Sequence, residues 1–522
     1  MKVLKKIKTF HILIILVCGI IIMAKGAPLY GDDYVKVWES ESAIAGPVYD
    51  VEVGDIDGDG MPEIIAADFS LSGSAKVYVF ENNGDDSYQL VWDSGNILSM
   101  FFCFIEVGDQ DKDGKLEIIA VELRHEPPFN GKIHVFENNG DNTYEEVWNN
   151  GNAFNGIQPS ALFLGDADND GKREIIIGTD YQSGDRKIRI YENIGDNAYQ
   201  ETWNSGSMLS DTVREGAVGD TDKDGKKEII IGFGGIDSRV YVFENNGDNS
   251  FEGPVWNSGS TFTKGGCVSI GDQDGDGEPE IIASGGRDRI VHVFENSGDN
   301  SYTNVWNSGT LNSYPARAAI GDQDQDGNRE LIIPCADGKV YVFENTGDNN
   351  YEEVWNSGSV MSGYIYDAAV GDQDADGKKE IIAASYSGKV YVFENPGPPT
   401  ITIEIDIKPG SWPNAVNPRS KGVIPVAILT TNKAVGESVD FDATAVDPLS
   451  VKFGPGEAVE AHGKGHIKDV DSDGDLDMVL HFKTPETSIQ YGDTEACLTG
   501  KTLDGKSIEA CDAIVTVGKG KK

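Results

Sequence analysis

Hydrophobic residues along this chain occur in short runs that are separated by polar turns. Residues 48–53, 63–66, 76–80 and 88–92 form four such runs, and most of their members are β-branched, aromatic or otherwise apolar. Short runs of this composition, bounded by glycine, asparagine and aspartate, are typical of β-strands. The pattern therefore predicts four consecutive strands in this part of the chain.

This four-run unit is repeated seven times, and every copy carries an acidic segment between its first and second runs. The segment reads Gly-Asp-x-Asp-x-Asp-Gly-x-x-Glu, and copies begin 50 to 57 residues apart, at Gly54, Gly108, Gly165, Gly219, Gly271, Gly321 and Gly371. A period near 50 residues matches one four-stranded propeller blade, whereas helical solenoid repeats are mostly shorter. We therefore expect an all-β fold with seven blades.

The two ends of the repeat region complement each other. The seventh unit has a strand-like run at 392–395, but no strand with a Val-Trp pair follows it. A matching Val-Trp segment, containing Trp38, stands before the first acidic segment instead. An N-terminal strand can thus complete the last blade and leave no exposed sheet edge. We predict a closed seven-bladed β-propeller at residues 30–397, in preference to an open array of β units.

The acidic segments have the composition of a calcium-binding loop. In the first unit Asp55, Asp57 and Asp59 are two residues apart, Gly60 permits a sharp turn, and Glu63 occupies position nine. Calcium takes six to eight oxygen ligands, and these carboxylates, the backbone carbonyl at position seven and water can supply them. An EF-hand needs glutamate at position twelve and helices on both sides, whereas position twelve here lies in a strand-like run.

The same five positions supply the predicted calcium ligands in every unit. They are Asp55, Asp57, Asp59, Met61, Glu63, Asp109, Asp111, Asp113, Lys115, Glu117, Asp166, Asp168, Asp170, Lys172, Glu174, Asp220, Asp222, Asp224, Lys226, Glu228, Asp272, Asp274, Asp276, Glu278, Glu280, Asp322, Asp324, Asp326, Asn328, Glu330, Asp372, Asp374, Asp376, Lys378 and Glu380. An eighth acidic segment near the C-terminus adds Asp469, Asp471, Asp473, Asp475 and Asp477.

Acidic turns without an ion are the alternative. They would hold four carboxylates close together, and two charges about 4 Å apart repel by roughly 4 kcal/mol at an effective dielectric constant of about 20. The four carboxylate positions of the seven loops account for 28 of the 87 acidic residues. Seven divalent ions would offset much of this repulsion, so we predict calcium as the cofactor.

The strands and acidic loops of residues 35–395 resemble the FG-GAP repeats of integrin α subunits and related bacterial VCBS-type repeats. The resemblance implies a propeller in which each loop joins the first and second strands of its blade and holds one calcium ion. Integrin units usually carry aspartate at position nine, where all seven loops here carry glutamate. Direct and water-mediated coordination by this longer side chain both stay open.

The N-terminus has the layout of a secretory signal. Lysines at positions 2, 5, 6 and 8 precede an apolar run at 12–24, which is shorter than the roughly 20 residues that cross a bilayer as a helix. We expect a signal peptide at residues 1–26, no transmembrane segment in the mature chain, and a location outside the cell or at its surface. Removing its five lysines changes the formal net charge from −44 to −49, which disfavours nucleic acid as a partner.

Residues 401–522 follow a proline-rich linker and predict a separate, sandwich-like β domain. Cys497 and Cys511 flank a short turn-containing stretch, and in an exported protein this spacing favours a disulfide. His462, His466 and His481 raise the question of a zinc site, but a spacing of four in a loop without cysteines favours ordinary surface or turn residues.

Blade topology places the acidic loops and the third-to-fourth strand hairpins on one face of the propeller. The pairs Asn83-Gly84, Asn139-Gly140 and Asn246-Gly247 predict tight turns in these hairpins. The loops of the other face vary more and form the expected recognition face. Their aromatic and arginine residues suit sugars or proteins, and include Phe69, Arg124, His125, Phe129, Tyr181, Arg287, Tyr314, Arg317, Tyr364 and Tyr366.

These observations favour a binding or adhesion module for an extracellular glycan or protein ligand. A calcium-dependent polysaccharide lyase or hydrolase on the same scaffold is the main alternative, and a structural role at the cell surface is another. No Ser-His-Asp or Cys-His motif is evident, so no catalytic residue is assigned.

Overall fold

A computed structural model describes residues 34–518, except 71–73, 85, 125, 141, 236–238, 248, 260, 262–265, 397–399, 434–438 and 504. The predicted signal peptide at residues 1–26 and His125 lie outside the described residues. One compact unit spans Asp32–Gly397 and a second includes Pro398–Lys522. Among the described residues, no helix has the length and apolar character needed to span a membrane.

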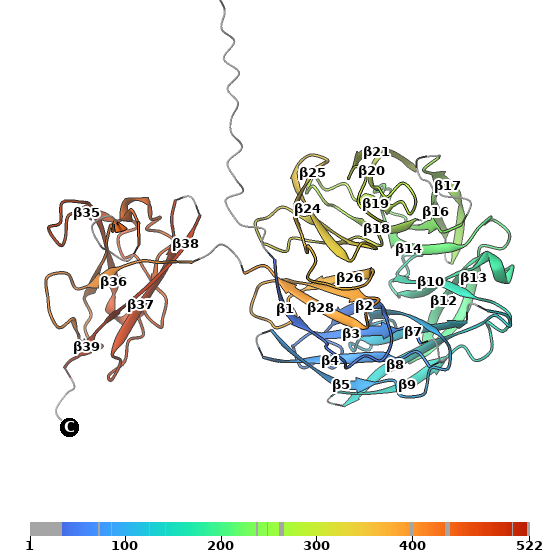
Figure 1. Ribbon diagram of the computed structural model, residues 1–522, viewed down its shortest axis with the longest axis horizontal. Coiled ribbons are helices and arrows are strands. Elements are labelled where there is room, and N and C mark those ends of the chain that lie inside the picture. Colours follow the sequence, from blue (N-terminus) through green and yellow to red (C-terminus); the bar gives the residue numbers. More distant parts are fainter. Residues whose placement is uncertain are drawn as a thin grey trace, which may run out of the picture. The chain divides into compact units, whose positions relative to one another are not determined.

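The first unit consists of four-stranded antiparallel sheets, seven of them within the described residues (Figure 1). Their strands are β2 (Val48–Gly54), β3 (Glu63–Asp68), β4 (Val77–Gly84) and β5 (Ser87–Asp93); β6 (Phe102–Gly108), β7 (Glu117–Arg124), β8 (Asn130–Gly140) and β9 (Thr143–Asn149); β10 (Pro159–Gly165), β11 (Glu174–Thr179), β12 (Ile188–Gly195) and β13 (Ala198–Asn204); β14 (Val213–Gly219), β15 (Glu228–Phe233), β16 (Val240–Gly247) and β17 (Ser250–Asn257); β18 (Cys267–Gly271), β19 (Glu280–Ser284), β20 (Val291–Gly298) and β21 (Ser301–Asn307); β22 (Ala319–Gly321), β23 (Glu330–Cys335), β24 (Lys339–Gly347) and β25 (Asn350–Asn356); and β26 (Ile365–Gly371), β27 (Glu380–Ser385) and β28 (Lys389–Glu394) with β1 (Val35–Glu39).

The sheets surround a common centre, with the first strand of each innermost (Figure 1). The second strands, such as β3 and β11, are buried along their whole length. Burial against a neighbouring sheet on each face explains why these strands are continuous apolar runs without alternation. The predicted all-β propeller is confirmed.

Strand β1 closes the ring by joining the sheet of β26, β27 and β28. It pairs with β28 in antiparallel register, and Trp38 lies opposite Val392. The Trp38 ring also packs edge-on against Phe80 and Tyr88 of the next sheet, at centroid distances of 5.5 and 5.3 Å. The N-terminal strand therefore connects the last sheet to the first, as the complementary ends of the repeat region predict.

The hairpins between third and fourth strands reverse later than predicted. Gly84 pairs with Ser87, so the chain reverses after Gly84, and Asp86 adopts a φ of 52°. Five other hairpins have asparagine at this place with φ between 45° and 51°: Asn142, Asn197, Asn249, Asn300 and Asn349. Asparagine and aspartate tolerate this left-handed conformation better than most residues. The predicted turns at Asn83-Gly84, Asn139-Gly140 and Asn246-Gly247 were therefore wrong in position, because these pairs end the preceding strands.

The second unit contains two main sheets. One has the order β29 (Ile401–Thr402), β38 (Ser507–Ala513), β37 (Glu495–Lys501), β33 (Lys452–Phe453) and β34 (Ala458–Val459), and the other has the order β30 (Ile405–Ile407), β32 (Val423–Ile428), β36 (Asp477–Lys483) and β35 (His466–Lys468). A small sheet pairs β31 (Ala415–Val416) with β39 (Val515–Thr516). Residues of both main sheets, such as Leu498 and Leu480, share one buried core.

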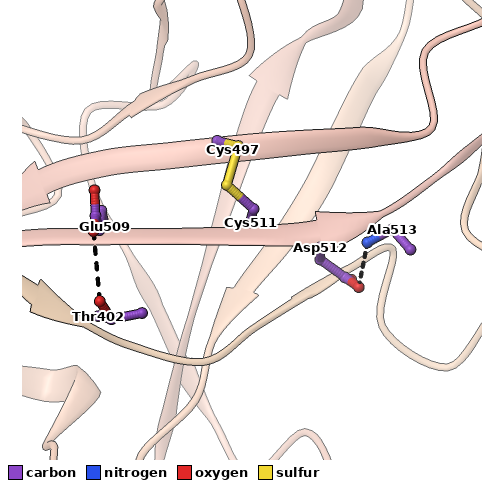
Figure 2. The surroundings of a disulfide bond; sticks show 6 residues. All are labelled: Thr402, Cys497, Glu509, Cys511, Asp512 and Ala513. Carbon is purple, nitrogen blue, oxygen red and sulfur yellow. Dashed lines mark hydrogen bonds between the residues drawn. A yellow bond between two sulfur atoms is a disulfide. The ribbon is translucent and has the colours of Figure 1, made fainter.

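Figure 2 shows the predicted disulfide, which joins adjacent strands of the larger sheet. Cys497 on β37 lies opposite Cys511 on β38, and their sulfur atoms are 2.07 Å apart. Cys103 and Cys335 are buried in the propeller, whereas Cys267 is only partly buried. The predicted disulfide is therefore confirmed.

Candidate calcium loops and a central pocket

Each acidic segment forms the loop between the first and second strands of its sheet. In the first loop Asp55, Asp57, Asp59 and Glu63 each contribute an oxygen, and these atoms all lie within 4.8 Å of one another. The equivalent residues of the next three loops, beginning at Asp109, Asp166 and Asp220, converge in the same way. The structure therefore brings the four predicted carboxylate ligands of each of these loops close enough together that they could hold a metal ion.

The glutamate at position nine has two different oxygen environments. Glu63 Oε2 accepts a hydrogen bond from the Ile56 amide at 2.7 Å, whereas Oε1 is buried without a hydrogen-bond partner. All seven loops share this arrangement, with Glu117, Glu174, Glu228, Glu280, Glu330 and Glu380 in the other six. A buried carboxylate oxygen without a donor is costly unless a cation approaches it. The loops therefore fit a bound cation.

Burial raises the pKa of these glutamates far above the ordinary value of 4.5. The pKa is about 8 for six of them, such as Glu63, and about 9 for Glu330, with the neighbouring aspartates raising it further. A divalent cation would supply the positive charge that keeps such a group ionised. Carboxylate and carbonyl oxygens are the hard ligands that calcium prefers.

The remaining loop positions are fixed by short-range hydrogen bonds. Asp55 accepts from the amides of Gly58 and Gly60 at 2.8 and 3.1 Å, and Asp59 accepts from that of Met61 at 2.8 Å. In five loops the first aspartate has a buried Oδ1 without a partner: Asp109, Asp166, Asp220, Asp322 and Asp372. Lysine side chains at position seven pair both with a strand glutamate and with the third loop aspartate, as Lys172 does with Glu192 at 2.6 Å and with Asp170 at 3.0 Å.

The second aspartate of a loop also bonds to the neighbouring sheet. Asp168 Oδ2 accepts from the Asn249 amide at 3.1 Å, and Asp374 Oδ2 accepts from the Asp86 amide at 3.0 Å. Four further pairs of this kind are Asp57 with Asn142, Asp111 with Asn197, Asp222 with Asn300, and Asp274 with Asn349. The loops thus connect consecutive sheets through the left-handed turn residues.

The eighth acidic loop joins β35 and β36 in the second unit. Asp477 at its position nine accepts from the Val470 amide at 2.8 Å, as Glu63 does from Ile56. Its other oxygen accepts from the Thr430 amide at 2.9 Å. Asp469 and Asp471 accept from amides within the loop, as in the propeller loops.

A cavity of about 570 Å³ lies at the opposite ends of the innermost strands from the acidic loops. Its wall includes the residue four positions before each loop glycine: Asp50, Phe104, Ala161, Glu215, Cys267, Arg317 and Asp367. All seven sheets therefore contribute to one central pocket.

One side of the central pocket is aromatic. Tyr49 stacks on Tyr366 at a centroid distance of 4.5 Å and contacts Phe102 and Phe104 edge-on at 5.7 and 5.9 Å. Tyr364 lies next to Tyr366 at 6.3 Å. Aromatic faces of this kind can pack against a sugar ring or a side chain.

Three arginines also line the central pocket. Arg214 and Arg287 are exposed, and neither has a carboxylate within ion-pair distance among the described residues. Arg317 lies deeper and bonds to Glu52 at 2.7 Å and to Glu106 at 3.0 Å. The pocket thus contains two exposed guanidinium groups, of which Arg214 also interacts with Cys267 and with the charge of Glu215, and a third, Arg317, that belongs to a buried ionic network.

The ionic network contains more acids than bases. Burial raises the pKa of Asp50 and Glu106 well above their ordinary values and that of Glu215 to about 7, although the Arg317 charge opposes these shifts. Burial is therefore the dominant influence on these carboxyl groups.

The structure divides the predicted recognition residues. Arg287, Tyr314, Arg317, Tyr364 and Tyr366 line the central pocket. Phe69 and Arg124 lie outside its lining, where Phe69 stacks on Phe102 and Arg124 lies over the Phe101 ring. Among the aromatic and arginine residues of the lining, the sequence-based prediction missed Tyr49, Phe102, Phe104 and Arg214. Alignment of the units on the loop glycine indicates three of these positions, because Tyr49 and Arg214 lie five residues before it and Phe104 lies four residues before it. Phe102 lies six residues before Gly108 and does not follow from this alignment.

A closed ring of four-stranded sheets defines a β-propeller, and the acidic loops of its sheets could hold metal ions. The family model described as FG-GAP-like repeat matches residues 55–120, 109–177, 166–231, 220–283 and 322–383, together more than half of the chain. The chain therefore belongs to the FG-GAP-like repeat family, whose propellers typically serve as binding or scaffold folds.

Two solved structures are similar to this chain at 13% sequence identity. The first is a crystal structure of BBS1N in complex with ARL6DN. The matched region covers 70% of this chain and 97% of the chain in that structure, with a TM-score of 0.47. The second is the crystal structure of Saccharomyces cerevisiae Sqt1, where the matched region covers 69% of this chain and 97% of the Sqt1 chain, with a TM-score of 0.45. No curated protein matches the chain.

Proposed function

We propose that this protein is an exported, calcium-binding propeller that binds a glycan or protein ligand outside the cell or at its surface. The observation that carries the proposal is the central pocket, where exposed aromatic rings and exposed arginines line one cavity. Calcium has a structural role in this proposal, because the acidic loops and the pocket lie at opposite ends of the innermost strands.

The chemistry of the pocket suits a ligand with both apolar faces and hydrogen-bond acceptors. Tyr314 and Tyr364 are 55% and 53% exposed, so their rings are available for stacking. Arg214 and Arg287 are exposed at the pocket, so their guanidinium groups can donate to hydroxyl or carboxylate oxygens of a ligand. Sugar rings and the side chains of a protein loop both meet these requirements.

A binding screen with matched variants tests this proposal. Calcium-loaded protein is applied to a glycan array and to a library of displayed peptides, and the affinity of each hit is measured. Tyr364→Ala and Arg287→Ala should each weaken binding at least tenfold, whereas Ile194→Ala, at an exposed residue of the β12–β13 hairpin, should leave it unchanged. Equal affinity of all three variants would place the binding surface elsewhere.

Sugar cleavage is the second candidate function. Glu215 lines the pocket and has a pKa of about 7, which is suited to a general acid or base at neutral pH. Polysaccharides that bind are therefore also incubated with the protein and assayed for new reducing ends and unsaturated products. Saturable binding without products supports the binding module, whereas turnover that is lost in Glu215→Gln supports the enzyme.

A further inference from the structure

Three histidines of the second unit lie together on the outer face of the four-stranded sheet. His466 begins β35 and His481 lies on β36, and the register pairs His466 with Val479, two residues from His481. Side chains two residues apart on a strand share a face, so these imidazoles are diagonal neighbours. Met478, Leu480 and Phe482 occupy the alternate, core-facing positions of β36.

His462 joins them from the turn that precedes β35. Its ring centroid lies 6.0 Å from that of His466 and 5.2 Å from that of His481, and the latter two are 5.4 Å apart. One ring nitrogen of each histidine lies within 4.8 Å of the other two. Nitrogens around a tetrahedral zinc ion, at about 2.0–2.1 Å from it, are roughly 3.4 Å apart. Small side-chain rotations therefore suffice to bring all three onto one ion.

The side chain of Glu460 fixes the backbone around the three histidines. Its side chain is 1% exposed and accepts hydrogen bonds from the backbone amides of His462, Lys464 and His481 at 2.5, 3.2 and 3.2 Å. Its Oε1 also lies 3.4 Å from His462 Nδ1. One buried carboxylate thus fixes the turn against β36, and it can orient an imidazole as carboxylates do beside metal-bound histidines.

We propose that His462, His466 and His481 form a binding site for a divalent transition metal, with zinc as the expected ion. Imidazole nitrogens suit zinc and are poor ligands for calcium, which selects oxygen. The site is therefore separate from the acidic loops. Because His462 and His466 are exposed, solvent reaches the fourth coordination position, and water or a donor group of an incoming molecule completes the tetrahedron. His481 Nδ1 is buried and makes no hydrogen bond, and it lies 4.0 Å from Glu460 Oε1, so Glu460 lies beside two of the three imidazoles.

Metal titration of the untagged full chain tests the proposal. Millimolar calcium is kept in the buffer so that the acidic loops are occupied, and zinc binding is followed by calorimetry. Cobalt(II) absorption reports tetrahedral nitrogen coordination independently. We expect one zinc ion per chain, at least tenfold weaker binding in each of His462→Ala, His466→Ala and His481→Ala, and no saturable site in the triple variant.

Two further variants separate a built site from a chance cluster. Glu460→Gln should weaken zinc binding about 10- to 100-fold, the usual effect of losing a group that orients a metal-bound histidine. Lys464→Ala, in the same turn, should leave the affinity unchanged. Disulfide integrity and the melting curve of each variant show that it is folded. Zinc binding that survives in the folded triple variant, or no saturable binding in the original chain, would overturn the proposal.

Discussion

At the scale of single residues, the glutamate at position nine of each propeller loop determines how the loop can coordinate an ion. Glu63 uses one oxygen to accept from the Ile56 amide, and the other oxygen is buried without a partner. Aspartate at this place reaches less far from the strand. The orientation of Glu63 favours direct coordination, the first of the two modes that the sequence left open.

Glu63→Gln should remove one calcium ion per chain while preserving the hydrogen bond to the Ile56 amide. The amide side chain is isosteric but supplies no negative charge to the loop. At calcium concentrations one hundred times the dissociation constant, the loss of one site costs about 2.7 kcal/mol of unfolding free energy. Bound calcium is counted by elemental analysis after gel filtration, and the free energy is measured by denaturant titration. Glu145→Gln, at an exposed strand position, is the control, and equal calcium content in both variants would contradict the assignment.

Glu215 should make the stability of the calcium-loaded protein depend on pH. Its pKa in the folded protein is about 7, above the ordinary 4.5, because burial disfavours its ionised form. The folded state therefore binds this proton more tightly, and the resulting stabilisation is complete below pH 4.5 and lost as pH rises through 7. Asp50, Glu52, Glu106, Asp367 and Arg317 belong to the same network, so the comparison with Glu215→Gln isolates the contribution of Glu215.

Melting temperatures in saturating calcium between pH 5 and 8 measure this dependence. The melting temperature of the original chain should fall toward pH 8 more steeply than that of Glu215→Gln. Parallel curves for the two proteins would show that Glu215 does not change its protonation state in this range.

At the scale of elements, the ring is closed by the pairing of β1 with β28, which joins the N-terminal strand to the last sheet. We call this pairing the seam. Trp38 packs against Phe80 and Tyr88 of the first sheet. The Ser40 amide continues the β1–β28 pairing by donating a hydrogen bond to the Val390 carbonyl at 3.0 Å. Every other fourth strand follows its own third strand directly through a hairpin. The seam therefore depends on side-chain packing more than the continuous blades do.

Trp38→Ala should destabilise the propeller by about 3–5 kcal/mol, the usual cost of removing a large packed aromatic ring. Trp412→Ala is the matched control, because Trp412 is 83% exposed and its loss should change stability little. Limited proteolysis near residue 40 and the unfolding free energy are measured for both. If Trp38→Ala is as stable and as resistant as the control, β1 does not hold the ring closed.

The elements that could be predicted from sequence are those whose partners follow from order along the chain. Repetition indicated the sheets, the unmatched Trp38 segment indicated the seam, and a short turn-containing stretch indicated the Cys497–Cys511 disulfide. Features that depend on register between strands could not be read in this way. The histidine cluster needs His466 and His481 to share one face of a strand pair, and the aromatic side of the central pocket needs Tyr49, Phe102 and Tyr366 to meet from three different sheets.

At the scale of the whole molecule, the formal net charge of −44 makes the stability of the fold depend on bound cations. The propeller loops concentrate acidic groups in regularly placed clusters, and several position-nine glutamates are wholly buried. Without cations these groups either repel one another or take up protons, and both outcomes cost free energy at neutral pH. Calcium is therefore expected to stabilise the ring as a unit, because six loops also bond to the neighbouring sheet.

Chelation of calcium should lower the melting temperature of the propeller markedly, and added salt should restore part of the loss. The Debye length falls from about 10 Å at 0.1 M to about 3 Å at 1 M ionic strength, so sodium chloride screens repulsion between clusters. It cannot replace an ion at the buried oxygens of position nine, and recovery should stay incomplete. Melting is followed by calorimetry with calcium, with chelator, and with chelator plus 1 M salt, and added calcium provides the reversal control. An unchanged melt after chelation would show that the acidic loops do not depend on calcium, whereas full recovery in salt would show that general screening, rather than a bound ion, is what the clusters require.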